Sequence, residues 1–168
     1  ECQYIEREAE LTKQQKELFS EMARHAAIKS LGVTTENEAD VLNKLTQILT
    51  GCLYLPGGKT MDIDCGPRLD VVNEVVEAAE GKVIVFTTHK HTLKALSEAL
   101  KKQFETFVVS GDVPIGQREQ IFTRFQNEAG KQVIAAHPAT MSHGLTLTAA
   151  NTIIWFGPPP APETYHQA

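Results

Sequence analysis

The sequence has few cysteines and no paired cysteine motif. Cys2, Cys52 and Cys65 form an odd set without C-x-x-C spacing, which argues against a zinc ribbon and against the disulfide framework of a small secreted domain. No apolar run approaches the length of a membrane span, and the opening residues are too acidic for a signal peptide. We therefore expect a cytoplasmic protein without a membrane partner.

An excess of positive charge is also missing. The formal net charge of the 168 residues is -5, so any nucleic acid must be contacted through a local patch, backbone amides or helix N-termini.

A complete phosphate loop is missing as well. Such a loop has the pattern G-x-x-x-x-G-K-[S/T] between a strand and a helix. Gly58, Lys59 and Thr60 imitate its last three residues, but Leu53 stands where the first glycine belongs, and the segment that follows Thr60 has no helical pattern. We interpret these residues as a turn.

The first third of the chain has the pattern of helices followed by a hairpin. Apolar residues at helical spacing predict helices within 12–30 and 34–51, and Thr12 with Gln15 has the pattern of a capping box. Rough alternation on both sides of Pro-Gly-Gly predicts a hairpin in 52–64. We divide this part into a small helical element, 1–51, and a hairpin with linker, 52–66.

The rest of the chain alternates helices with short apolar strands. The predicted strands are 82–87, 105–109, 132–136 and 151–156, and the helices between or before them are 67–80, 90–103 and 115–127. This order is typical of an α/β domain with a doubly wound parallel sheet and helices on both faces. We assign 67–168 to that domain, with Trp155 in its core.

Polar loops follow the predicted strands. They begin at Thr87, Ser110, His137 and Gly157. In open α/β sheets ligands bind at the carboxyl ends of the strands, so these loops are the candidate site.

The order of four stretches resembles a known family. They are "KVIVFTTHKHTLKALSEAL", "VVSGDVPIGQREQIFTRFQ", "QVIAAHPATMSHGLTLTAANTIIWF" and "ETYHQA". Together they resemble the second, C-terminal RecA-like lobe of superfamily-two helicases, and within that group the Swi/Snf-like DNA-dependent ATPases of phage and bacterial type. The resemblance covers 67–168, where it stops within the sixth motif, and the earlier helices are similar to the helical element that precedes this lobe.

The resemblance implies roles for single residues. The positions that it assigns to DNA contact are Thr87, Thr88, His89, Gly111, Arg118 and His137. Those that it assigns to the nucleotide cleft are Gly144 and Thr146 in the fifth motif and Gln167 in the sixth. The arginines of the sixth motif are expected after Ala168, so no catalytic residue is expected within this chain. From its residue type alone, Arg118 fits a salt bridge to a neighbouring loop equally well.

The resemblance also implies cofactors and partners. ATP and Mg²⁺ would be used by an intact protein whose N-terminal RecA-like lobe, on the same polypeptide, carries the true phosphate loop. The nucleic acid would be DNA, and the present chain alone would not hydrolyse ATP. Two alternatives stay open: the second lobe of an RNA helicase, and a non-catalytic α/β module that binds a protein or a small ligand.

Several histidines follow the predicted strands or lie near their ends. These are His89, His91, His137, His143 and His166. Zinc sites need ligands at fixed spacing, and the sequence shows a single H-x-H without a partner pattern. We therefore predict no metal site.

Overall fold

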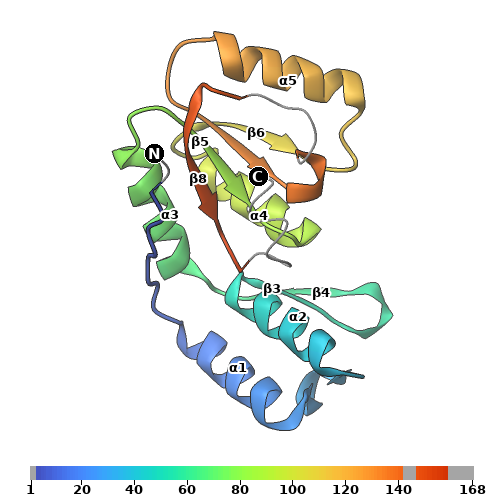
Figure 1. Cartoon of the computed structure of the whole chain (residues 1–168). Coiled ribbons are helices and arrows are strands. Elements are labelled where there is room, and N and C mark those ends of the chain that lie inside the picture. The colour runs from blue at the N-terminus through green and yellow to red at the C-terminus, as the bar shows by residue number, and fades with distance from the viewer. Residues whose placement is uncertain (1–2, 142–146, 159–168) are drawn as a thin grey trace. The chain divides into compact units, whose positions relative to one another are not determined.

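The computed structural model describes residues 3–141 and 147–158 (Figure 1). The chain divides into two compact units, Glu1–Val75 and Val76–Ala168. This division concerns compactness alone, and the domain limits expected from the sequence, 1–51, 52–66 and 67–168, stay predictions. None of the helices in the described part of the chain has the length and apolar character needed to span a bilayer.

Two helices and their connection build the first unit. Helix α1 (Lys13–His25) begins with the predicted capping box, in which the Thr12 side chain accepts from the Gln15 amide and the Gln15 side chain accepts from the Thr12 amide. The buried Gln15 amide also donates to the carbonyls of Ile48 and Leu49, at 3.0 and 3.1 Å, at the end of α2 (Glu38–Leu49). One side chain thus caps two helices.

The predicted helix within 12–30 ends five residues before that limit. Ala26 adopts a left-handed conformation, with φ 51°, and β1 (Ala27–Ile28), a short 3-10 turn and β2 (Val33–Thr34) follow. Ile28 and Val33 join the core of the unit with Met22, Ile48 and Leu53. The apolar residues after His25 therefore belong to a small two-stranded ribbon and do not extend the helix.

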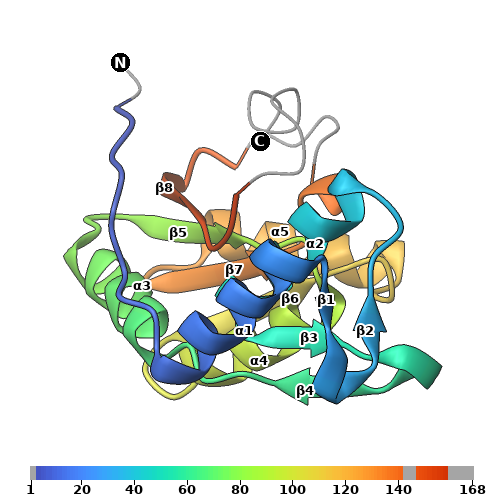
Figure 2. The ribbon, with the colours of Figure 1, turned by 90° about the horizontal axis from the view of Figure 1, so that it is seen from below.

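The predicted hairpin is confirmed. Strands β3 (Cys52–Tyr54) and β4 (Thr60–Asp62) pair antiparallel (Figure 2). Gly57 and Gly58 both have φ 75°, a conformation that glycine adopts at little cost and that closes the turn. Lys59 is exposed and a strand, not a helix, follows it. These residues form the expected turn and lack the geometry of a phosphate loop.

A parallel sheet forms the second unit. Its strands are β5 (Lys82–Phe86), β6 (Glu105–Val109), β7 (Gln132–Ala136) and β8 (Ala150–Trp155), in the order β6-β7-β5-β8. Each neighbouring pair is parallel. Helix α3 (Gly66–Ala78) precedes the sheet, α4 (Lys90–Leu100) connects β5 to β6, and α5 (Ile115–Asn127) connects β6 to β7.

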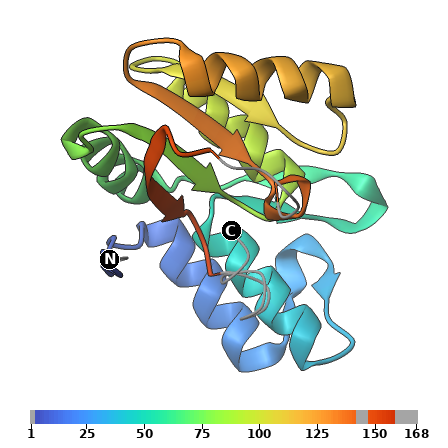
Figure 3. The same ribbon diagram turned by 45° about the horizontal axis from the view of Figure 1, so that its top comes forward.

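Helices cover both faces of this sheet (Figure 3). All residues of β5 and β7 are buried, as expected for strands covered on two sides. On one face, Phe125 of α5 packs in a cluster with Ile84, Phe86 and Ile134. On the other face, α4 contacts β6 and β7 and buries Leu93, Leu96 and Leu100.

The doubly wound α/β fold predicted from the sequence is therefore confirmed. Trp155, predicted to be a core residue, packs against that first cluster, with its ring 5.0 Å from the ring of Phe86.

Candidate functional site

The carboxyl ends of three neighbouring strands meet at one edge of the sheet. Phe86 and Val109, the last residues of β5 and β6, both pair with Ala136, the last residue of β7. The hydrogen bonding between these strands continues one residue past the ends of β5 and β7. The Thr87 amide donates to the Ala136 carbonyl, and the His137 amide donates to the Val109 carbonyl, both at 3.1 Å. The loops after these strands therefore leave the sheet side by side, as topology predicts.

The first of these loops holds Thr87, Thr88 and His89. Thr87 is 3% exposed, so its side chain supports the loop from inside. The Thr88 hydroxyl and the His89 Nδ1 atom lie 3.4 Å apart, and both residues are half-buried. Thr88 and His89 are thus the members of this loop whose side chains reach the surface.

The second loop is held by Arg118 of α5. Its Nε donates to the Val113 carbonyl at 2.6 Å, and one terminal nitrogen donates to the Gly111 carbonyl at 3.2 Å. The Val113 amide closes the turn on the Ser110 carbonyl at 3.1 Å. In the described structure Arg118 therefore bonds to the backbone of this turn, whereas the sequence suggested a salt bridge or a DNA contact.

Gly111 in the same loop is not required by the fold. Its φ lies outside the left-handed range, and a Cβ atom added there would meet nothing within 4 Å. A side chain at this position would therefore be tolerated by the described part of the fold.

The third loop begins at His137. The His137 Nδ1 atom accepts from the Ala139 amide at 3.2 Å, so a neutral ring carries its proton on Nε2. The Thr140 hydroxyl donates to the His137 carbonyl at 2.6 Å and lies 3.3 Å from the Val109 carbonyl. Thr140 thus ties the third loop to the end of β6.

An ion pair that the sequence did not suggest joins the first residue of α4 to the second loop. Lys90 Nζ and Asp112 Oδ2 lie 2.5 Å apart, with side chains that are 75% and 64% exposed. Exposed pairs add little stability, so this contact mainly orients the loops and neutralises both charges. Its partners follow β5 and β6, two strands that are separated by β7 in the sheet.

The edge therefore offers neutral donors and little net charge. The Thr88 hydroxyl, the two histidine rings and the backbone at Gly111 are grouped there. Among residues 3–141 and 147–158, no group of three or more His, Cys, Asp or Glu residues could hold a metal ion. The residues assigned to the nucleotide cleft, Gly144, Thr146 and Gln167, lie outside the described residues.

The fold is similar to that of solved proteins from Sulfolobus solfataricus. The SWI2/SNF2 ATPase C-terminal domain matches with a TM-score of 0.62 and 24% identity, over 88% of this chain and 68% of that one. The SWI2/SNF2 ATPase core domain matches with a TM-score of 0.61 and 22% identity, over 89% of this chain and 33% of that one. The SWI2/SNF2 ATPase core in complex with dsDNA matches with a TM-score of 0.56 and 24% identity, over 85% of this chain and 30% of that one.

At these identities the similarity shows a common fold. This chain spans about a third of the length of either ATPase core. Residues 67–168, more than half of the chain, match the helicase conserved C-terminal domain. The chain therefore belongs to the helicase C-terminal domain family, with the fold of a RecA-like C-terminal lobe.

Proposed function

We propose that this chain is the second lobe of an ATP-dependent DNA helicase or translocase of the Swi/Snf-like type. It would contribute half of an interlobe ATP cleft and part of the surface that contacts DNA. The observation that supports this most is that a helicase C-terminal lobe gathers Thr88, His89, Gly111 and His137 at the carboxyl edge of its sheet. The similarity to an ATPase core whose structure includes dsDNA favours DNA over RNA.

The edge would contact the phosphodiester backbone of DNA and not its bases. Phosphate oxygens would accept hydrogen bonds from the Thr88 hydroxyl and from histidine N–H groups, and the open space at Gly111 would let the backbone of the turn approach the strand closely. Because Lys90 is neutralised by Asp112 and Arg118 bonds to its own turn, few free cations take part. We expect weak binding that salt weakens further.

ATP and Mg²⁺ would be bound mainly by a first lobe. The described residues contribute neither an acidic magnesium site nor a phosphate loop in its strand-to-helix context. ATP supplies the free energy for lobe closure in such enzymes. The cysteines show no C-x-x-C spacing and no disulfide framework, which favours the reducing environment of the cytoplasm.

The proposal is tested by DNA binding to two glycine variants. In neither Gly111→Ala nor Gly116→Ala would the new methyl group meet an atom within 4 Å, and neither glycine has a left-handed φ. Both variants should fold, and Gly116→Ala should not lower the free energy of unfolding, because alanine is a better helix former than glycine and Gly116 lies in the first turn of α5. Gly111→Ala should weaken duplex DNA binding several-fold, whereas Gly116→Ala should bind like the parent chain.

Fluorescence anisotropy with duplex DNA and duplex RNA at two ionic strengths measures this difference. Equal DNA affinity of folded Gly111→Ala and parent chain would contradict the assignment of this loop. A clear preference for RNA would identify the lobe of an RNA helicase. A tight complex that salt does not weaken would contradict the proposed contacts.

A further inference from the structure

An ion pair lies next to two residues that are proposed to contact DNA. Lys90 Nζ and Asp112 Oδ2 are 2.5 Å apart, with side chains that are 75% and 64% exposed. Lys90 follows His89 directly in the chain, and Asp112 follows Gly111. Each partner is therefore the chain neighbour of a proposed DNA contact, so a DNA strand that contacts both loops would pass next to this ion pair.

The backbone on both sides of Asp112 is held in place. Arg118 donates to the carbonyl of Gly111, the residue before it, at 3.2 Å, and to that of Val113, the residue after it, at 2.6 Å. The Val113 amide also donates to the Ser110 carbonyl at 3.1 Å. The turn thus presents the Asp112 carboxylate from a fixed backbone.

The other partner lies at the amino terminus of a helix. Lys90 is the first residue of α4, and the Leu93 amide donates to the His89 carbonyl at 2.8 Å. The positive end of the helix dipole lies at this terminus, so it disfavours the ammonium group of Lys90 and favours an anion. In the structure, the anion that is bound to Lys90 is the Asp112 carboxylate.

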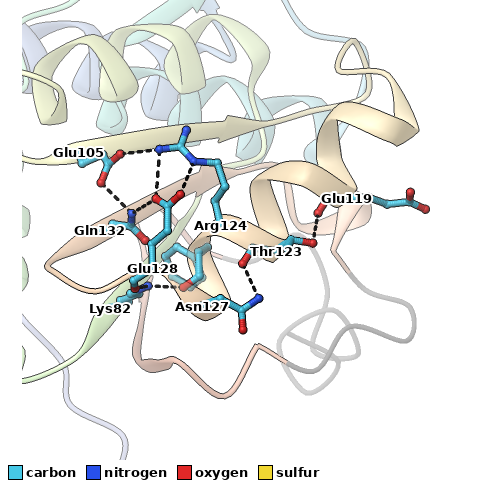
Figure 4. Close-up of polar contacts among 9 residues, drawn as sticks. Lys82, Glu105, Glu119, Thr123, Arg124, Asn127, Glu128 and Gln132 are labelled. Carbon is cyan, nitrogen blue, oxygen red and sulfur yellow. Dashed lines mark hydrogen bonds and ion pairs between the residues drawn. The ribbon is translucent and has the colours of Figure 1, made fainter.

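Ion pairs at the opposite edge of the sheet are built differently (Figure 4). Arg124 of α5 bonds both carboxylate oxygens of Glu128, at 2.9 and 3.1 Å, and reaches Glu105 of β6 at 3.2 Å. Glu105 and Glu128 also accept from the Gln132 side chain of β7, at 2.7 and 3.3 Å. In the described part of the chain, no such hydrogen bond to the Asp112 carboxylate accompanies its ion pair. Another anion can thus replace Asp112 without breaking a network.

We propose that Asp112 is a built-in counter-ion that limits the affinity of this edge for DNA. A phosphate oxygen of DNA would replace the Asp112 carboxylate on Lys90, so binding would exchange one anion for another and would gain little from the charge of the lysine. Exposed ion pairs add little stability, so the exchange would also cost little. The inference rests on the proposed function, because it takes DNA as the incoming anion.

DNA affinity at two ionic strengths tests the role of Asp112. Asp112→Asn keeps the shape of the side chain and removes its charge, so a phosphate that binds Lys90 no longer competes with this carboxylate. By fluorescence anisotropy, the variant should bind duplex DNA several-fold more tightly than the parent chain at low salt. A rise from about 50 to about 200 mM salt should reduce this gain about threefold, because one more phosphate is neutralised.

A general change of net charge is controlled by Glu98→Gln. Glu98 is exposed near the other end of α4, and its replacement changes the net charge by the same amount. This variant should raise DNA affinity much less than Asp112→Asn does. Both variants should unfold at the urea concentration of the parent, because an exposed ion pair adds little stability.

Chemical modification of lysines tests whether Lys90 itself meets DNA. Acetylation by sulfosuccinimidyl acetate, followed by peptide mass spectrometry, reports on the exposed ammonium group of Lys90. Duplex DNA should slow this acetylation in the parent chain, and more strongly in Asp112→Asn. Lys102, which is exposed just after the end of α4, is the reference and should keep its rate.

Two results would overturn the role of Asp112. One is a DNA affinity of folded Asp112→Asn that equals that of Glu98→Gln, and the other is acetylation of Lys90 at the same rate with and without DNA. In either case, binding of the parent chain to duplex DNA would leave the proposed function standing. If neither the parent nor Asp112→Asn binds duplex DNA at low salt, the proposed function fails, and the role of Asp112 fails with it.

Discussion

At the scale of single residues, Cys52 shows how burial controls the chemistry of a side chain. Burial in the first unit, and after it the carboxylate of Asp62 across the hairpin, together raise the pKa of its thiol to about 11. The thiolate is the reactive form. Cys52 is therefore protonated and shielded at neutral pH.

We expect iodoacetamide to modify Cys65 before Cys52 in the folded chain at neutral pH. The pKa of Cys65 is also raised, mainly by burial, but its side chain is only partly covered. Peptide mass spectrometry would follow both sites, with the denatured chain as control, where their rates should converge. Raising the pH toward 11 should speed modification of Cys52, and early modification at neutral pH would contradict its burial.

At the scale of elements, Lys82 acts as a cap supplied by a strand to a helix. Its ammonium group bonds to two carbonyls at the end of α5, where the helix dipole also favours positive charge. Lys82→Met keeps the apolar stem and leaves these carbonyls without their donor. We expect a loss of about 1–3 kcal/mol in the free energy of unfolding, measured by urea denaturation.

Lys94→Met is the control for this change, because Lys94 is exposed on α4. It should alter stability by less than about 0.5 kcal/mol. Equal stability of the two variants would mean that water can replace the cap.

The elements of the sheet were predictable from the sequence because each strand is a short apolar run between turn signals. Strand β7 and helix α5 begin and end where the periodicity predicts. The ribbon of β1 and β2 was not predictable, because two-residue strands have no periodicity of their own. Helical propensity around 26–30 is overridden there by burial of Ile28 and Val33.

Much less of the site could be predicted than of the fold. The loops after the predicted parallel strands, together with the family resemblance, indicated Thr88, Gly111 and His137 as members of one edge. The roles of Arg118 and of Lys90 with Asp112 depend on side-chain directions within loops, and no sequence spacing encodes these directions.

At the scale of the whole molecule, the turn around Lys59 provides a test of where ATP is bound. Lys59 is exposed in a hairpin and is followed by a strand. We expect the present chain to show no ATP turnover with or without DNA. In the two-lobed protein, Lys59→Ala should leave ATPase activity unchanged in a coupled phosphate-release assay.

The lysine of the first lobe's phosphate loop is the reference for this experiment. Its replacement should abolish turnover. A collapse of activity in folded Lys59→Ala would show that the hairpin takes part in ATP hydrolysis.

The position of β5 in the sheet has a consequence for synthesis on the ribosome. Its two neighbours, β7 and β8, both follow it in the chain, and β7 begins only at Gln132. At about 5–20 residues per second, the apolar segment 82–86 waits several seconds for its first partner strand. The nascent chain thus exposes this apolar segment early, and we expect chaperone contact to concentrate there until β8 has been made.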